Sequence, residues 1–286
     1  MTRALLALLA GVVALATTRL LLRSMIPTAP LRRPNYRGMP VASGMGIALL
    51  IGITSGAAIG ALLFSLNTTS RLLGTTVGIS VPLLALCLGF GLIGLFDDLS
   101  EAPERGFRGH LAAAREGRAT SGALKMFGGT VIAIAIAAPE STNFGWTLVH
   151  GAIIALSANV FNGFDLRPGR AGKFFFIAAL PLAIAATKLP TAMFGAAIGA
   201  TAGFLPDDVR ERAMLGDTGA NALGALIGGG VVYAEPAAWV RLAVLGGLAF
   251  LTMLGERPGF GRMIAAVPPV RALDRAGRVP EPEITT

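Results

Sequence analysis

Apolar residues occur along this chain in long runs, separated by shorter polar segments. An α-helix needs about 20 apolar residues to cross the hydrocarbon core of a bilayer, and several runs approach that length. The runs lie at roughly 4–22, 43–66, 72–96, 126–139, 144–161, 173–187, 191–206, 218–233 and 237–254. The first is longer than the apolar part of a typical signal peptide. The pattern therefore predicts an all-α, polytopic bundle of about 9–10 transmembrane helices.

Long and short polar connections alternate between these runs. With nine spans, one side of the membrane receives the long connections, which are 23–42, 97–125, 162–172, 207–217 and the tail 255–286. The same side receives all but four of the 24 Lys and Arg residues; the exceptions are Arg3, Arg71, Lys188 and Arg241. Because Lys and Arg are enriched in cytoplasmic loops, we expect the long loops and the C-terminus in the cytoplasm and the N-terminus outside.

Composition supports a membrane protein. Of the 286 residues, 53% are hydrophobic and only 14% are charged, with a mean hydropathy of +0.68. A soluble domain would carry about 25% charged residues. We therefore expect one integral-membrane domain over 1–286. The single cysteine, Cys87, excludes an internal disulfide. In a membrane protein, a net charge of +8 indicates basic loops that set the topology and contact anionic lipids of the bilayer, so no nucleic acid partner is expected.

Two adjacent carboxylates, Asp97 and Asp98, end the run at 72–96. The C-terminal end of a helix carries the negative pole of its dipole, which disfavours further negative charge. Neighbouring carboxylates also resist joint ionisation unless a cation relieves them. Either the pair is solvated and has no role, or a positive group lies beside it.

Other polar side chains end or begin runs on the same predicted side. Asn159, Asn162 and Asp165 end the run at 144–161, and Asp217 precedes the run at 218–233. A single loop aspartate is usually only solvated. Acids from three segments at one membrane edge, however, favour a functional site.

The spacing of Asn159, Asn162 and Asp165 keeps them near one flank of a helix. The amides need partners, which are each other, the helix end or a ligand. Arg167 and Arg170 follow at once and add two guanidinium groups.

Further cations, Arg105, Arg108, His110 and Lys125, lie in the loop after Asp98. They set topology or form an anion site, since the guanidinium fork suits phosphate oxygens. The chain has only 2 histidines, which argues against a histidine-based zinc site.

Asp217 stands between two glycines in a helix-start pattern, Gly216-Asp217-Thr218-Gly219. Asp or Thr could cap the helix, or a phosphate or metal–phosphate pair could bind at its N-terminus. Mg²⁺ takes oxygen ligands and commonly combines one or two carboxylates with substrate phosphates. Acids, arginines and a membrane edge together predict phosphoryl transfer to or from a lipid, with Mg²⁺, or Mn²⁺ in its place, as the metal.

Three stretches, Gly94–Asp98, Asn159–Asp165 and Met214–Ala220, resemble the polyprenyl-phosphate N-acetylhexosamine-1-phosphate transferases. This family includes the phospho-MurNAc-pentapeptide transferase of peptidoglycan synthesis and GlcNAc-1-phosphate transferases. The stretch Asn35–Pro40 looks like its first cytoplasmic loop, which implies substrate contacts for Arg37. The histidine-rich loop of the family has no counterpart in Gly255–Phe260.

The resemblance implies a bacterial plasma-membrane enzyme. In such enzymes a polyprenyl phosphate attacks the β-phosphorus of a UDP-amino sugar and releases UMP. It implies that Asp217 ligates Mg²⁺, that Asp97 orients or deprotonates the lipid phosphate, and that Asp98 is its partner at the metal or the nucleotide. By the same likeness, Asn159, Asn162 and Asp165 contact the nucleotide and its diphosphate.

Three alternatives stay open or are set aside. An ion-coupled transporter predicts acids near the bilayer midplane, whereas these lie at one edge. A catalytically silent relative that binds lipid-linked intermediates or a partner enzyme stays open. The longer Asp signature of CDP-alcohol phosphotransferases is absent. The small-residue stretch Gly195–Gly199 predicts close helix packing, either within the chain or across a homodimer.

Overall fold

The computed structural model describes residues 3–65, 73–100, 121–185, 189–255 and 259–280. The long helices are α1 (Arg3–Met25), α2 (Gly46–Ser65), α3 (Leu73–Leu99), α5 (Ser121–Ala137), α6 (Phe144–Phe164), α7 (Arg170–Ala185), α8 (Thr191–Asp208), α9 (Gly216–Ala234) and α10 (Ala238–Gly255). Each predicted apolar run coincides with one of them, so the all-α prediction is confirmed.

Among the described residues, 6 helices are long and apolar enough to cross a membrane. They are α1, α2, α3, α5 (whose apolar stretch continues to Glu140), α6 and α10. The remaining long helices, α7, α8 and α9, are shorter or carry more glycine and polar residues. The chain is an all-α polytopic membrane protein.

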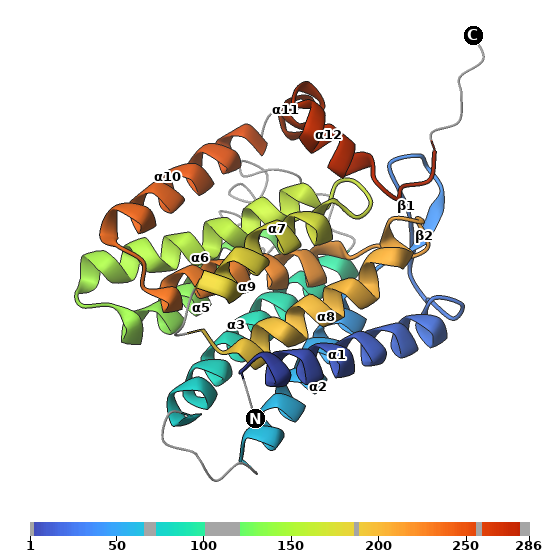
Figure 1. Ribbon diagram of the computed structural model, residues 1–286. Coiled ribbons are helices and arrows are strands. Elements are labelled where there is room, and N and C mark those ends of the chain that lie inside the picture. Colours follow the sequence, from blue (N-terminus) through green and yellow to red (C-terminus); the bar gives the residue numbers. More distant parts are fainter. Residues whose placement is uncertain (1–2, 66–72, 101–120, 186–188, 256–258, 281–286) are drawn as a thin grey trace.

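Helix α9 lies at the centre of the bundle, where α3, α6, α2 and α7 pack around it (Figure 1). Almost every side chain from Thr218 to Tyr233 is buried. Glycines allow this close packing: a Cβ at Gly224 would lie 2.5 Å from the carbonyl oxygen of Ser157 on α6. Since α9 contacts protein on all sides, its sequence can be less apolar than that of a lipid-facing helix.

Helices α1 and α8 pack through small residues. A Cβ at Gly195 would overlap the carbonyl of Ala7, and one at Gly199 would overlap that of Gly11. The stretch Gly195–Gly199 therefore packs against α1 of the same chain, which was one of the two possibilities left open by the sequence.

Several short elements were not predicted. The loop before α2 forms an antiparallel hairpin of β1 (Arg32–Pro34) and β2 (Pro40–Ala42), and Ala42 also bridges to Ala213. A 3-10 turn, Ala138–Glu140, follows α5. In the region treated as a tail, α11 (Gly259–Ala266) and α12 (Pro268–Arg275) form. Elements this short carry too few residues for a hydropathy period to reveal them.

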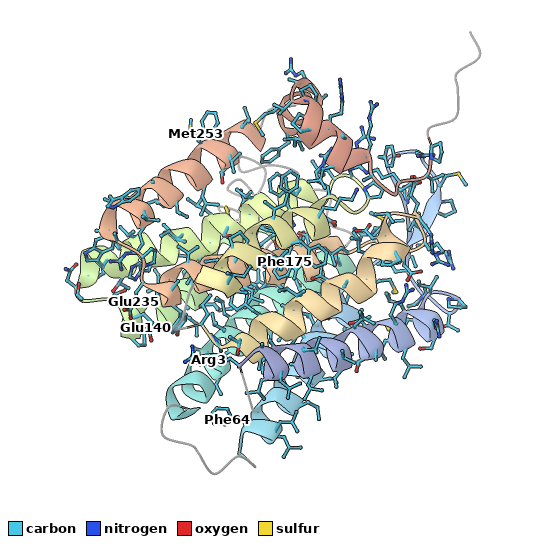
Figure 2. All side chains as sticks on the ribbon, in the orientation of Figure 1. Arg3, Phe64, Glu140, Phe175, Glu235 and Met253 are labelled. Carbon is cyan, nitrogen blue, oxygen red and sulfur yellow. The ribbon has the colours of Figure 1, made fainter. Side chains whose placement is uncertain are left out.

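Helix α10 is the outermost long helix and packs along α6 (Figure 1). It has no buried side chain within the described part of the chain. Figure 2 contrasts Phe175, fully buried inside the bundle, with Met253, 70% exposed on α10. An exposed face this apolar fits contact with lipid chains.

Candidate active site

The end of α3 rests directly on the start of α9. At the crossing a Cβ on Gly94 would lie 2.6 Å from the amide nitrogen of Thr218 and would overlap the carbonyl of Asp217. The absence of a side chain at Gly94 therefore lets the two backbones meet. The carboxylates three and four residues later are brought to the first turn of α9.

Asp98 caps α9 from another helix. Its Oδ1 accepts a hydrogen bond from the amide of Asp217 at 3.0 Å. Its Oδ2 accepts from the amide and the hydroxyl of Thr218 at 3.0 and 2.6 Å. The side chain is only 6% exposed. The negative charge that was unfavourable at the end of α3 thus lies at the positive end of α9, where exposed N–H groups stabilise it.

Asp217 is consequently not used for capping, and its carboxylate faces α5. Lys125 forms an ion pair with Asp217, and its Nζ lies 3.8 Å from Oδ2 of Asp97. All three side chains are partly exposed. Of the two possibilities for the adjacent acids, the structure therefore shows the one with a positive group beside them, and Lys125 supplies it.

Asp165 approaches the same turn from the end of α6. Its Oδ2 accepts a hydrogen bond from the amide of Gly216 at 2.9 Å. Burial raises the pKa of Asp165, the negative charges of Asp208 and Asp217 raise it further, and the Gly216 amide opposes the shift. Aspartates from three separate segments therefore surround the start of α9.

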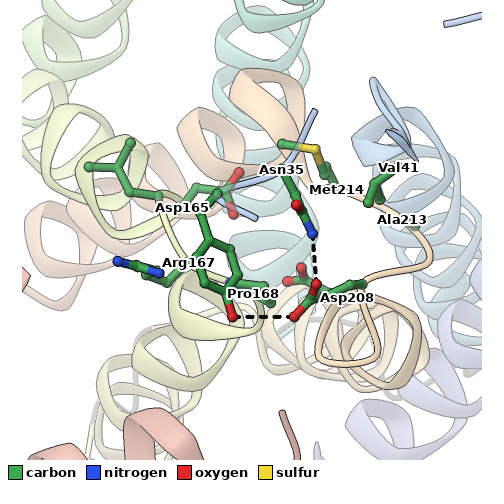
Figure 3. A pocket seen from close by; sticks show the side chains of 11 residues that line it. Asn35, Val41, Asp165, Arg167, Pro168, Asp208, Ala213 and Met214 are labelled. Atoms are coloured by element: carbon green, nitrogen blue, oxygen red, sulfur yellow. Dashed lines mark hydrogen bonds between the residues drawn. The ribbon is translucent and has the colours of Figure 1, made fainter. Parts of the chain in front are cut away.

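A small cavity of about 40 Å³ adjoins Asp165. Figure 3 shows Asp165, Arg167 and Pro168 on one side of it and Val41, Ala213 and Met214 on the other. Glu211 connects polar residues that line this cavity: it accepts hydrogen bonds from Asn35 Nδ2 at 2.7 Å and from the Tyr36 hydroxyl at 3.3 Å (Figure 3).

Of the arginines that were candidates for phosphate binding, Arg167 remains at this cavity, with its guanidinium 4.2 Å from the centre of the Tyr36 ring. Arg37 pairs with Glu211 at 3.1 Å and donates to the carbonyls of Val279 and Pro280.

Arg170 is buried and forms a two-pronged pair with Asp274 of α12, with bonds of 2.8 and 3.1 Å. In this structure Arg37 and Arg170 hold the C-terminal segment against the bundle.

Two larger clefts flank α6. One of about 170 Å³ is lined by Asn159, Asn162 and Thr252 and by glycines and Phe260. The other, of about 380 Å³, opens beside Lys125 and runs between apolar side chains such as Phe90, Met126 and Leu156. Asn159 lines both.

Some residues at these sites were not singled out by sequence reasoning. Asn35, Tyr36, Asp208 and Glu211 line the cavity at Asp165, and Asn221 lines the large cleft. Asn221 had a signal, since it interrupts an apolar run four residues after Asp217. The candidates Arg105, Arg108 and His110 lie outside the described residues.

Within the described ranges no three His, Cys, Asp or Glu side chains are grouped to hold a metal by themselves. Asp97 and Asp217, however, already flank a cation, because the Lys125 ammonium lies between them. Two carboxylates completed by substrate phosphates form an ordinary Mg²⁺ site. Asp98, in contrast, directs both oxygens at the backbone of α9.

No family model matches the chain. It is 30% identical over 226 residues to a phospho-N-acetylmuramoyl-pentapeptide-transferase from Desulforamulus reducens. The aligned region takes in 73% of this chain and 64% of that protein, so the chain spans less than two thirds of the relative's length.

Proposed function

We propose that this chain belongs to the polyprenyl-phosphate sugar-1-phosphate transferases and moves an amino-sugar-1-phosphate from a UDP-sugar to a polyprenyl phosphate. One observation carries the proposal: Lys125, which is paired with Asp97 and Asp217, lines the apolar cleft of about 380 Å³. A charged cluster at the entrance of an apolar space suits a substrate with an anionic head and a hydrocarbon tail. The similarity to a transferase of this kind supports the assignment.

The acceptor would bind in the large cleft, with its phosphate at Lys125 and its chain between α3, α5 and α6. Lys125 is now paired with carboxylates. When a phosphate arrives, the ammonium would exchange one carboxylate for phosphate oxygens, which offer more negative charge.

The donor would bind on the other side of Asp217, toward Asp165 and the cleft lined by Asn162. The Nδ2 atom of Asn162 has no hydrogen-bond partner among the described residues, so a nucleotide oxygen can be its acceptor. Arg167, held over Tyr36, adds a positive charge at the neighbouring cavity.

The metal would be Mg²⁺, with Mn²⁺ as a substitute, held by Asp217 and Asp97. When bound, it neutralises charge on the transferring phosphate. Asp98 would act at a distance by fixing the turn that carries Asp217.

The reaction itself needs little proton chemistry. An oxygen of the lipid phosphate forms a bond to the sugar-bearing phosphorus of the UDP-sugar. The bond from that phosphorus to the bridging oxygen breaks, and UMP leaves with the electron pair. A phosphate monoester is already largely ionised near neutral pH, so the work of the protein is positioning and charge neutralisation. The product would be a polyprenyl-diphospho-sugar, the first lipid-linked intermediate of an envelope glycan.

The test is release of UMP by the purified protein with Mg²⁺, polyprenyl phosphate and a panel of UDP-amino sugars. We expect UMP with at least one sugar, dependent on both lipid and metal. A transferase of known activity run in parallel is the positive control. If that enzyme releases UMP while this protein releases none with any sugar, the proposed activity is wrong.

A further inference from the structure

Asn221 is a buried polar side chain without a partner. It lies on α9, is 2% exposed, and neither its Nδ2 nor its Oδ1 has a hydrogen-bond partner within the described residues. A buried amide without partners is costly, and the great majority of such groups are satisfied in folded proteins. Both polar atoms of the Asn221 side chain are therefore available to a ligand or to water.

The position of Asn221 shows which cleft its side chain lines. It lines the apolar cleft of about 380 Å³, together with Lys125 and side chains such as Phe90 and Ala158. It follows Asp217 by four residues, so both lie on one face of α9, with Asn221 about 6 Å further along the helix axis. Because Asp217 pairs with Lys125 at the mouth, Asn221 lies one helical turn deeper in the same cleft.

The chemistry of the cleft restricts the ligand. An ammonium at the mouth favours an anion, and apolar walls favour a hydrocarbon chain. A neutral amide between them donates to an anion without adding a charge that would have to be buried. The span of about 6 Å between the two levels suits one phosphate group, with Lys125 on its outer side and Asn221 on its inner side.

We propose that Asn221 is an acceptor-binding residue: its Nδ2 donates to an oxygen of the phosphate monoester whose hydrocarbon chain fills the cleft. The inference rests on the proposed function, because it specifies where that function's lipid substrate is held. It adds a contact beyond the aspartates and explains why a polar residue is kept inside an apolar wall.

The first test measures binding without any sugar nucleotide. Farnesyl phosphate, farnesol and inorganic phosphate are titrated into the detergent-purified protein, and affinity is read by calorimetry. Asn221→Leu keeps the number and branching of the side-chain heavy atoms and should weaken farnesyl phosphate binding about tenfold or more, with farnesol unaffected. Asn221→Asp, which brings a negative charge to the phosphate, should weaken it further.

A matched control is Thr201→Val. Thr201 of α8 is also buried and its Oγ1 also lacks a partner among the residues described, but it is not one of those that line this cleft. This variant should bind farnesyl phosphate as the wild type does. Thermal unfolding guards against misfolding: replacing a partnerless amide by an apolar group should not lower the melting temperature of Asn221→Leu.

The outcomes separate this inference from the proposed activity. Unchanged farnesyl phosphate affinity in a folded Asn221→Leu protein would overturn the role of Asn221, even if the wild type releases UMP. A selective loss of farnesyl phosphate binding would support it, even if no sugar nucleotide yields UMP. If the wild type transfers sugar phosphate, Asn221→Leu should raise the KM for the lipid and leave the KM for the UDP-sugar unchanged.

Discussion

The two ends of α6 treat their polar side chains differently. At the first turns, Asn143 accepts from the amide of Trp146 at 3.1 Å, and His150 lies 2.8 Å from the Ser141 hydroxyl and 2.9 Å from a guanidinium nitrogen of Arg241. A guanidinium can only donate, so Nε2 of His150 accepts and its Nδ1–H donates to Ser141. Arg241 also stacks 4.3 Å from the Trp146 ring.

At the last turns the pattern is reversed. Asn162 has a buried Nδ2 without a partner, and Asn221 on the neighbouring α9 has none for either amide atom, counting the described residues only. Asp165 lies in the same region, where burial raises the pKa of its carboxyl group and the negative charges of Asp208 and Asp217 raise it further. The first end uses polar groups to join helices. The second leaves the amide groups of Asn162 and Asn221 without partners among the described residues, and this is why we place the substrates there.

The largest effect should come from Asp217→Asn. It removes the charge that Lys125 now neutralises and that a metal–phosphate pair would use, so UMP release should fall by about 10²-fold or more. The fold should survive, because Asp98 rather than Asp217 caps the helix. Asp207→Asn is the control, since that carboxylate pairs with Arg19 and Arg212 away from Lys125. Full activity of a folded Asp217→Asn protein would remove Asp217 from the proposed site.

Asp98 is an exception at the substrate end, because both its oxygens have partners. Asp98→Ala should therefore lower the free energy of unfolding by about 2 kcal/mol, because the cap is lost and the amides of Asp217 and Thr218 are left without their acceptor. Urea unfolding of the detergent-solubilised protein measures the change. Asp97→Ala, at the next position, should change stability much less. Equal stability losses in the two variants would contradict the assignment of the cap to Asp98.

The next largest effect is expected for Asn162→Leu, which changes a polar residue at the last turns of α6. If the Nδ2 atom of Asn162 serves the donor nucleotide, the KM for the UDP-sugar should rise about tenfold, a loss of one hydrogen bond to a charged group. The KM for the lipid and the melting temperature should stay as in the wild type. A drop in stability with unchanged KM would mean that Asn162 is structural, like His150 at the opposite end.

Much of the fold was predictable because a lipid-crossing helix must be long and apolar, and such runs mark both the type and the approximate ends of the elements. The proximity of Asp97, Asp165 and Asp217 was predictable too. Counting the predicted membrane spans assigns all three residues to the same side of the membrane. Hydropathy does not report the rotation of a helix, however. It therefore could not show that Asp98 points at α9 while Asp97 points toward Lys125.

Ion pairs between residues far apart in the sequence could not be predicted, for a related reason. Arg170 and Asp274 are separated by 104 positions and nothing in their local sequence links them. A buried arginine near acidic residues is read equally well as a phosphate ligand or as half of an ion pair. Only the path of the chain after α10, which brings α12 back onto α7, decides between the two.

The smallest effect should follow from Arg241→Met, at the first end of α6. The change removes the donor to His150 and the cation above Trp146, which together should lower the free energy of unfolding by about 1 kcal/mol. UMP release and both KM values should not change, because α10 contacts the other end of α6 at this point. The double variant with His150→Phe distinguishes a specific pair from general loosening of α10. If Arg241 and His150 act through their contact, the two losses of stability will be less than additive, whereas strict additivity would contradict that contact. A fall in UMP release would show instead that the two ends of α6 are not independent.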